Sequence, residues 1–96
     1  MAGGRGVIRG RIRTDDPTGT TVRTARHFAH KVEVERDGEV ERITIPSGHF
    51  ELEPAAGEVR IRLYPVDEAS APRLREVVAS HLERFDRTGG AIEWSD

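Results

Sequence analysis

Apolar and polar residues alternate along several short stretches of this chain of 96 residues, and that pattern predicts β-strands. In residues 7–14, Ile8, Gly10 and Ile12 share one face, while arginines occupy positions 9, 11 and 13 on the other. Further strands are predicted at residues 32–35, 40–45, 49–53, 58–64 and 91–94. Only one face of each strand is apolar, which is typical of an antiparallel sheet with one face in water.

The turns between these strands carry their own signals. Asp37-Gly38 lies in the turn 36–39, and this dipeptide is typical of a two-residue hairpin loop. Val40 is out of phase with Ile43 and Ile45, which predicts a bulge or a late start of that strand.

Two segments show the period of a helix instead. Asp16 and Pro17 favour a helix start, but Gly19 and the threonines after it are poor helix formers, so the helix that ends near residue 31 is predicted firmly only from Val22. Its buried face is expected to comprise Thr21, Ala25, Phe28 and in part Thr24, with Arg23, Arg26 and His30 opposite.

The second helix is predicted over residues 68–85, with Asp67 or Ser70 as its cap. His81 lies in the middle of its apolar stripe, which comprises Ala71, Leu74, Val77, Val78, Leu82 and Phe85. The order strand, helix, four strands, helix, short strand predicts a two-layer α+β fold with both helices on one face of the sheet. We expect residues 1–6 to be a flexible N-terminus and residues 7–96 to form a single domain.

Charge and composition argue against several classes of function. The net charge is −2, but residues 1–31 carry +5 (seven Lys and Arg, two Asp) and residues 32–96 carry −7 (eight Arg, fifteen acids). We expect the basic N-terminal segment to lie against the acidic strands, and no nucleic acid to bind, because the acidic remainder repels phosphate. The chain has no cysteine, no apolar run that spans a bilayer and no apolar signal segment, so we expect a cytoplasmic protein that does not bind membranes.

Two short motifs contain the candidate chemistry, His27-Phe28-Ala29-His30-Lys31 and His81-Leu82-Glu83-Arg84-Phe85. Because both helices must cover one sheet face, the two motifs are expected to meet. The candidate ligand-binding residues are His27, His30, Lys31, His81 and Arg84, and their charge favours a small anion. The three histidines are also candidate metal ligands, since imidazole suits Zn, Fe, Ni and Cu.

The alternative for these residues is structural. A histidine on an apolar helix face is usually a hydrogen-bonded core residue, and Lys31 and Arg84 can complement helix ends or pair with Glu83. Catalysis is not expected: Ser47, His49 and Glu51 are too close in sequence to be placed as a relay by different elements, and no phosphate or dinucleotide motif is present. No cofactor is predicted.

Several blocks together resemble a known bacterial family, the domain of unknown function number 2218. They are residues 27–32, Pro46 and Gly48, residues 77–85 and Ile92-Glu93-Trp94, and the resemblance spans Arg11 to Trp94. The chain departs from the family at Thr20, Thr21 and Thr24, where an aromatic residue and leucines are usual, and after Phe85, where Asp86-Arg87-Thr88 replaces an apolar-aromatic step.

The resemblance implies a fold similar to the phosphohexomutase C-terminal domain and to one half of the TATA-binding protein. Related domains are appended to flavin-dependent siderophore-interacting reductases, which implies a link to iron utilisation. We therefore expect a small non-catalytic binding or accessory domain whose partner is a siderophore or small anion. The alternatives are a structural or protein-interaction module, with a protein partner or a homodimer, and a histidine-based metal-binding domain.

Overall fold

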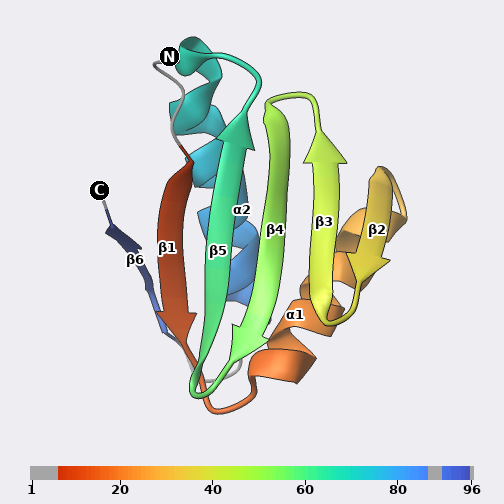
Figure 1. The fold of residues 1–96 in the computed structure, drawn as a ribbon, viewed down its shortest axis with the longest axis vertical. Helices are drawn as coiled ribbons and strands as arrows, with labels where there is room; N and C mark the ends of the chain where they lie inside the picture. Colours follow the sequence, from red (N-terminus) through yellow and green to blue (C-terminus); the bar gives the residue numbers. More distant parts are fainter. Residues whose placement is uncertain (1–6, 87–89, 96) are drawn as a thin grey trace.

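One antiparallel sheet of six strands organises the computed structural model, which describes residues 7–86 and 90–95 (Figure 1). The strand order is β2-β3-β4-β5-β1-β6. The strands are β1 (Ile8–Arg13), β2 (Glu33–Asp37), β3 (Val40–Ile45), β4 (Gly48–Ala55), β5 (Glu58–Pro65) and β6 (Ile92–Ser95). The predicted α+β class and the predicted order of elements are confirmed. The expected flexible segment 1–6 lies outside the described residues.

The N-terminal strand β1 lies inside the sheet, although it comes first in the chain. The strands β2 to β5 form a meander in sequence order, and β5 then pairs with β1. The short strand β6 pairs with the other edge of β1. The basic strand β1 therefore has β5 and β6 as neighbours rather than the acidic strand β2.

The first helix, α1 (Pro17–Ala29), begins earlier than its threonines suggest. The side chain of Asp16 accepts a hydrogen bond from the Gly19 amide at 3.1 Å, and Pro17 occupies the first turn, as predicted. Thr20 and Thr24 are fully buried against the sheet, and the Thr24 hydroxyl donates to the Thr20 carbonyl at 2.8 Å. Burial and this hydrogen bond compensate for the low helix propensity of threonine, so the predicted weak first half is wrong.

The second helix, α2 (Ala71–Phe85), follows a single 3-10 turn, η1 (Glu68–Ser70). Asp67 caps this turn by accepting from the Ser70 amide at 2.8 Å. The predicted helix start at residue 68 corresponds to η1, and the α-helix itself begins three residues later. Leu74, Val78 and Leu82 form its buried face.

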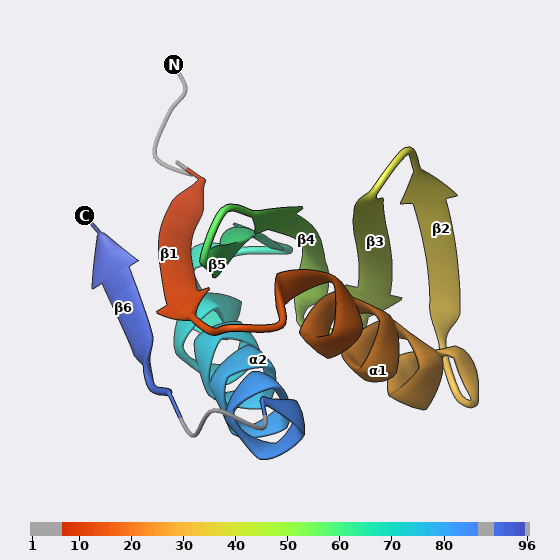
Figure 2. The ribbon, with the colours of Figure 1, turned by 90° about the horizontal axis from the view of Figure 1, so that it is seen from below.

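Both helices cover the same face of the sheet, as predicted, and the core lies between the two layers (Figure 2). The buried apolar residues come from both helices and from β1, β3, β4 and β5: Ile12, Ala25, Phe28, Ile43, Phe50, Leu52, Val59, Ile61, Leu63, Leu74, Val78 and Leu82. The other sheet face is open and carries rows of charged side chains from the strands. None of the helices in the described part of the chain is long and apolar enough to cross a bilayer.

The β2–β3 hairpin corrects one prediction. Val40 pairs regularly with Asp37, so the strand has neither a bulge nor a late start at that point. Glu41, not Val40, shares the core face with Ile43, and it is 3% exposed. Its carboxylate is held by Arg36, whose Nε lies 2.7 Å away. A paired carboxylate thus occupies a position where the apolar pattern would place an aliphatic residue.

Candidate functional site

The two predicted motifs meet where α1 crosses α2. The ring centroids of His27 and His81 lie 5.2 Å apart, and His27 also lies 5.1 Å from the ring of Phe85. Phe28 packs beneath them, with its centroid 4.6 Å from that of His81. We call these four residues the histidine seam. The expectation that His27 and His81 approach each other from neighbouring helices agrees with this geometry.

The hydrogen bonding of His81 defines its tautomer. Its Nδ1 lies 2.7 Å from the carbonyl oxygen of Val77, one helical turn earlier. A carbonyl can only accept, so Nδ1 carries the proton and donates it, which leaves a lone pair on Nε2. The ring is half-buried. The backbone contact matches the structural alternative for His81 and leaves one nitrogen available for chemistry.

The remaining predicted residues surround His27. Packing against its neighbours removes water from the His27 ring, which lowers its pKa, and nearby positive charges lower the pKa further. Those charges belong to His81, Arg84, Lys31 and His30. The structure brings all five candidates into one electrostatic neighbourhood. Only His81 is half-buried; the other four are exposed.

Two expectations about neighbouring side chains turn out differently. Glu83 does not pair with Lys31 or Arg84 among the described residues; its carboxylate accepts from the Ile92 amide at 3.2 Å. Arg23, expected on the solvent side of α1, instead donates Nε and Nη2 to the carbonyl oxygen of Phe85, each at 3.3 Å. Arg23 thus caps the end of α2 and joins the helices next to the histidine seam.

A second candidate site lies on the open face of the sheet, where charged side chains form rows across the strands. In one row, Glu35, Arg42, Glu51, Arg62 and Arg9 occupy directly opposed positions on five neighbouring strands. The charges alternate from β2 to β5 and then break, because Arg62 faces Arg9. Ion pairs cross the strands in the alternating part, from Glu51 to Arg42 and to Arg62.

Glu51 is the centre of the alternating part. It is only 8% exposed, although it lies on the open face. Arg42 Nη2 donates to it at 2.8 Å, Arg62 Nε at 2.9 Å and the Tyr64 hydroxyl at 3.3 Å. Burial alone raises the pKa of Glu51, but the hydrogen bonds and charges of the two arginines outweigh it, so the pKa is lowered. His49 stacks on Tyr64 at 4.5 Å between centroids, which accounts for its outward orientation.

The break in the pattern is repeated in the next row, where Arg11 faces Arg60. The expectation that the basic segment lies against acidic strands therefore holds only in part at β5: Arg13 faces Glu58, but Arg9 and Arg11 face arginines. Glu58 partly neutralises this second pair: it contacts Arg11 at 3.3 Å and Arg60 at 3.0 Å. Arg9 forms no ion pair with any residue in ranges 7–86 and 90–95.

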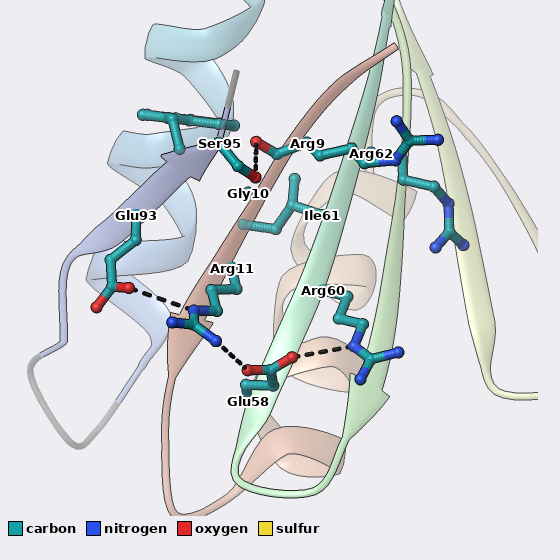
Figure 3. Close-up of a pocket in the computed structure, with 10 residues that line it drawn as sticks. Arg9, Gly10, Arg11, Glu58, Arg60, Ile61, Arg62, Glu93 and Ser95 are labelled. Atoms are coloured by element: carbon teal, nitrogen blue, oxygen red, sulfur yellow. Dashed lines mark hydrogen bonds and ion pairs between the residues drawn. The ribbon is translucent and has the colours of Figure 1, made fainter.

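These four arginines line a hollow of about 670 Å³ that we call the basic groove (Figure 3). Its wall also contains Glu58, Glu93 and Ser95, and Glu93 contacts Arg11 at 3.2 Å. Four arginines against two glutamates give this wall a net charge of +2. The alternating arginines of β1 are visible in the sequence, but the partner strand is not, so this groove was not predicted.

The comparisons with known proteins agree with the resemblance described above. A family model described as "Uncharacterized protein conserved in bacteria (DUF2218)" matches residues 9–95. The solution NMR structure of PA4090 from Pseudomonas aeruginosa is similar, with 29% identity, a TM-score of 0.74, and coverage of 93% of this chain and 94% of that one. No curated protein matches. From the match over nearly its whole length, the chain belongs to the DUF2218 family of uncharacterized bacterial proteins.

Proposed function

We propose that this protein is a non-catalytic domain that binds a small anion in the basic groove. Ferric siderophore complexes are the class of anion that the family resemblance suggests. The observation that supports the proposal best is the break in charge alternation at the β5–β1 boundary, where Arg9 faces Arg62 and Arg11 faces Arg60. Like charges at directly opposed positions destabilise a sheet unless something compensates them. An anion between the two strands would compensate them.

The chemistry of the groove suits carboxylate, catecholate or phosphate groups. A guanidinium presents several donors in a planar fork, which binds two oxygens of one anionic group together. Arg62 already contacts Glu51 at 2.9 Å and Glu53 at 3.0 Å, whereas Arg9 has no acidic partner in the described part of the chain. Arg9 is therefore the residue whose loss should affect ligand binding most and folding least.

The size of the hollow favours the basic groove over the histidine seam for an organic ligand. Pockets for small molecules are usually a few hundred to about 1,000 Å³, and the groove has about 670 Å³. The five residues predicted at and beside the seam, His27, His30, Lys31, His81 and Arg84, remain candidates for ligand binding, because their basic side chains lie close together.

The test is calorimetric titration of citrate, inorganic phosphate and a ferric tricatecholate siderophore onto the wild-type chain and onto Arg9→Ala. We expect Arg9→Ala to weaken binding about tenfold or more, because a hydrogen bond to a charged group contributes about 1.5–3 kcal/mol. The matched control is Arg26→Ala, which removes an exposed arginine from α1 on the other side of the sheet. Binding should also weaken with added salt.

Three outcomes would contradict the proposal: no heat with any of the three probes, equal affinity in the wild type and Arg9→Ala, or an equal loss in Arg26→Ala. Binding of the siderophore complex without binding of citrate or phosphate would support the siderophore class. The reverse result would leave anion binding intact and remove the link to iron.

A further inference from the structure

The histidine seam lies on the helix layer, on the opposite side of the sheet from the basic groove (Figures 1 and 2). Its two imidazoles come from different helices, and their ring centroids are 5.2 Å apart with the ring planes tilted by 45°. Their chemistry differs from that of the groove, because imidazole rings and not guanidinium groups face each other here.

The spacing of the two rings matches the spacing of two imidazoles on one tetrahedral metal ion. A zinc–nitrogen bond is about 2 Å long, so two ring centroids on one tetrahedral ion lie about 5 Å apart. The observed distance of 5.2 Å between the ring centroids agrees with this spacing, so the helices would not have to move apart or together to reach it. Arg23 bridges α1 to the last turn of α2, so the two histidines are also held in register.

In its neutral form each imidazole has a nitrogen lone pair with which it can bind a metal. The Nδ1 of His81 donates to the Val77 carbonyl at 2.7 Å, and a hydrogen bond of this kind to one ring nitrogen is the usual support of a histidine that binds metal through the other. Neither nitrogen of His27 is hydrogen-bonded to a described residue.

We propose that His27 and His81 form a two-imidazole site for a divalent transition-metal ion of the Zn²⁺, Ni²⁺ or Cu²⁺ type. Imidazole is a suitable ligand for these ions. Within residues 7–86 and 90–95 no group of three or more His, Cys, Asp and Glu side chains could hold a metal, so water would complete the coordination. This proposal is independent of anion binding in the basic groove.

The positive charges around the seam predict the direction in which metal affinity changes when one of them is removed. Arg84 and Lys31 lie close enough to lower the pKa of His27, so they also oppose a bound cation. Affinity should therefore be modest, and removal of a nearby positive charge should raise it. A metal bound elsewhere on the chain would not respond to Arg84 in this way.

The experiment is calorimetric titration of ZnCl₂ and, separately, NiCl₂ onto the full chain at pH 7. We expect one equivalent to bind, His27→Ala to weaken binding at least tenfold, and Arg84→Ala to strengthen it severalfold. The matched control is His49→Ala, because His49 stacks on Tyr64 on the open sheet face and should not affect the metal. His81→Ala should weaken binding like His27→Ala, with circular dichroism used to establish that this variant is folded.

The proposal fails if neither metal binds at millimolar concentration, if His27→Ala binds as tightly as the wild type, or if Arg84→Ala weakens binding. It also fails if His30→Ala abolishes binding while folded His81→Ala does not, because the site would then be the i, i+3 pair on α1. Citrate titrated onto His27→Ala separates the two sites, since anion binding in the basic groove should be unchanged.

Discussion

Replacing Glu51 by glutamine tests how the open face of the sheet is held together. The substitution keeps the size of the side chain and removes its charge. In the wild type, the nearly buried carboxylate accepts hydrogen bonds from Arg42 at 2.8 Å, Arg62 at 2.9 Å and Tyr64 at 3.3 Å. The variant leaves two guanidinium groups without their shared anion.

The structure sets the size of the effect. A hydrogen bond to a charged group contributes about 1.5–3 kcal/mol to the free energy of unfolding. The side chains of Arg42 and Arg62 are 51% and 26% exposed, so water can replace part of what they lose. We therefore expect Glu51→Gln to lower the free energy of unfolding by about 2 kcal/mol, which corresponds to a fall in Tm of about 10 °C in a domain of this size.

The stabilisation contributed by Glu51 depends on pH in a direction that the structure predicts. The folded state holds the pKa of Glu51 below that of the unfolded chain. The stabilisation by its carboxylate is therefore complete above the unfolded pKa of about 4.3 and is lost as the pH falls through the folded pKa. The gap between wild type and Glu51→Gln should be largest at pH 7 and should narrow below about pH 4.

The assay is urea unfolding followed by circular dichroism at several pH values. The control is Glu53→Gln, on the same strand, because Glu53 is 39% exposed and pairs with Arg62 at 3.0 Å. An exposed pair of this kind contributes less than about 1 kcal/mol. The reasoning would be refuted if Glu51→Gln were as stable as Glu53→Gln at pH 7, or if its deficit persisted unchanged in acid.

Three further substitutions test the scaffold. Gly48→Ala should lower the free energy of unfolding by more than about 2 kcal/mol in urea titrations, because its φ is +143° and an added Cβ would lie 2.3 Å from a β5 carbonyl oxygen. The control is Gly57→Ala, which has φ +71° and no heavy atom within 4 Å of the added Cβ and should lower it by about 1 kcal/mol. Equal losses in the two variants would contradict the predicted clash at Gly48. Thr21→Val should raise Tm by several degrees, because the buried Thr21 hydroxyl has no hydrogen-bond partner among the described residues; a lower Tm would show that the hydroxyl is paired. Arg23→Ala should lower the free energy of unfolding by about 1–2 kcal/mol through loss of its hydrogen bonds to the end of α2, whereas substitution of the exposed Arg26 by alanine should not. Equal Tm values for these two variants would argue that Arg23 does not cap α2.

The candidate seam shows how far the sequence can lead toward a site. Each helix has one apolar stripe and the sheet has one apolar face, so both helices must pack on that face. This places His27 and His81 near each other. The sequence does not give the 5.2 Å between their rings or the contact of His81 with the Val77 carbonyl. Those depend on side-chain rotamers and on the crossing point of α1 and α2, which long-range packing decides.

The threonines of α1 and the residues at the start of β3 illustrate the same limit within the fold. Propensity predicts a weak start for the helix, but Thr20 and Thr24 are stabilised by burial against strands that come later in the chain. The apolar pattern predicts a defect at Val40, but Arg36 lets Glu41 occupy the core face without a bulge. In both cases a contact with another element outweighs the preference of the segment itself.

The sequence by itself determined the α+β class, the order of the strands and helices, the helix layer on one sheet face and the outward direction of the arginines at 9, 11 and 13. These features follow from residue spacing, because side chains alternate along a strand and repeat every 3.6 residues along a helix. Only the tertiary structure decided that β1 lies between β5 and β6, so that Arg9 faces Arg62. Strand neighbours far apart in the chain are selected by the whole core, and the basic groove exists because of that selection.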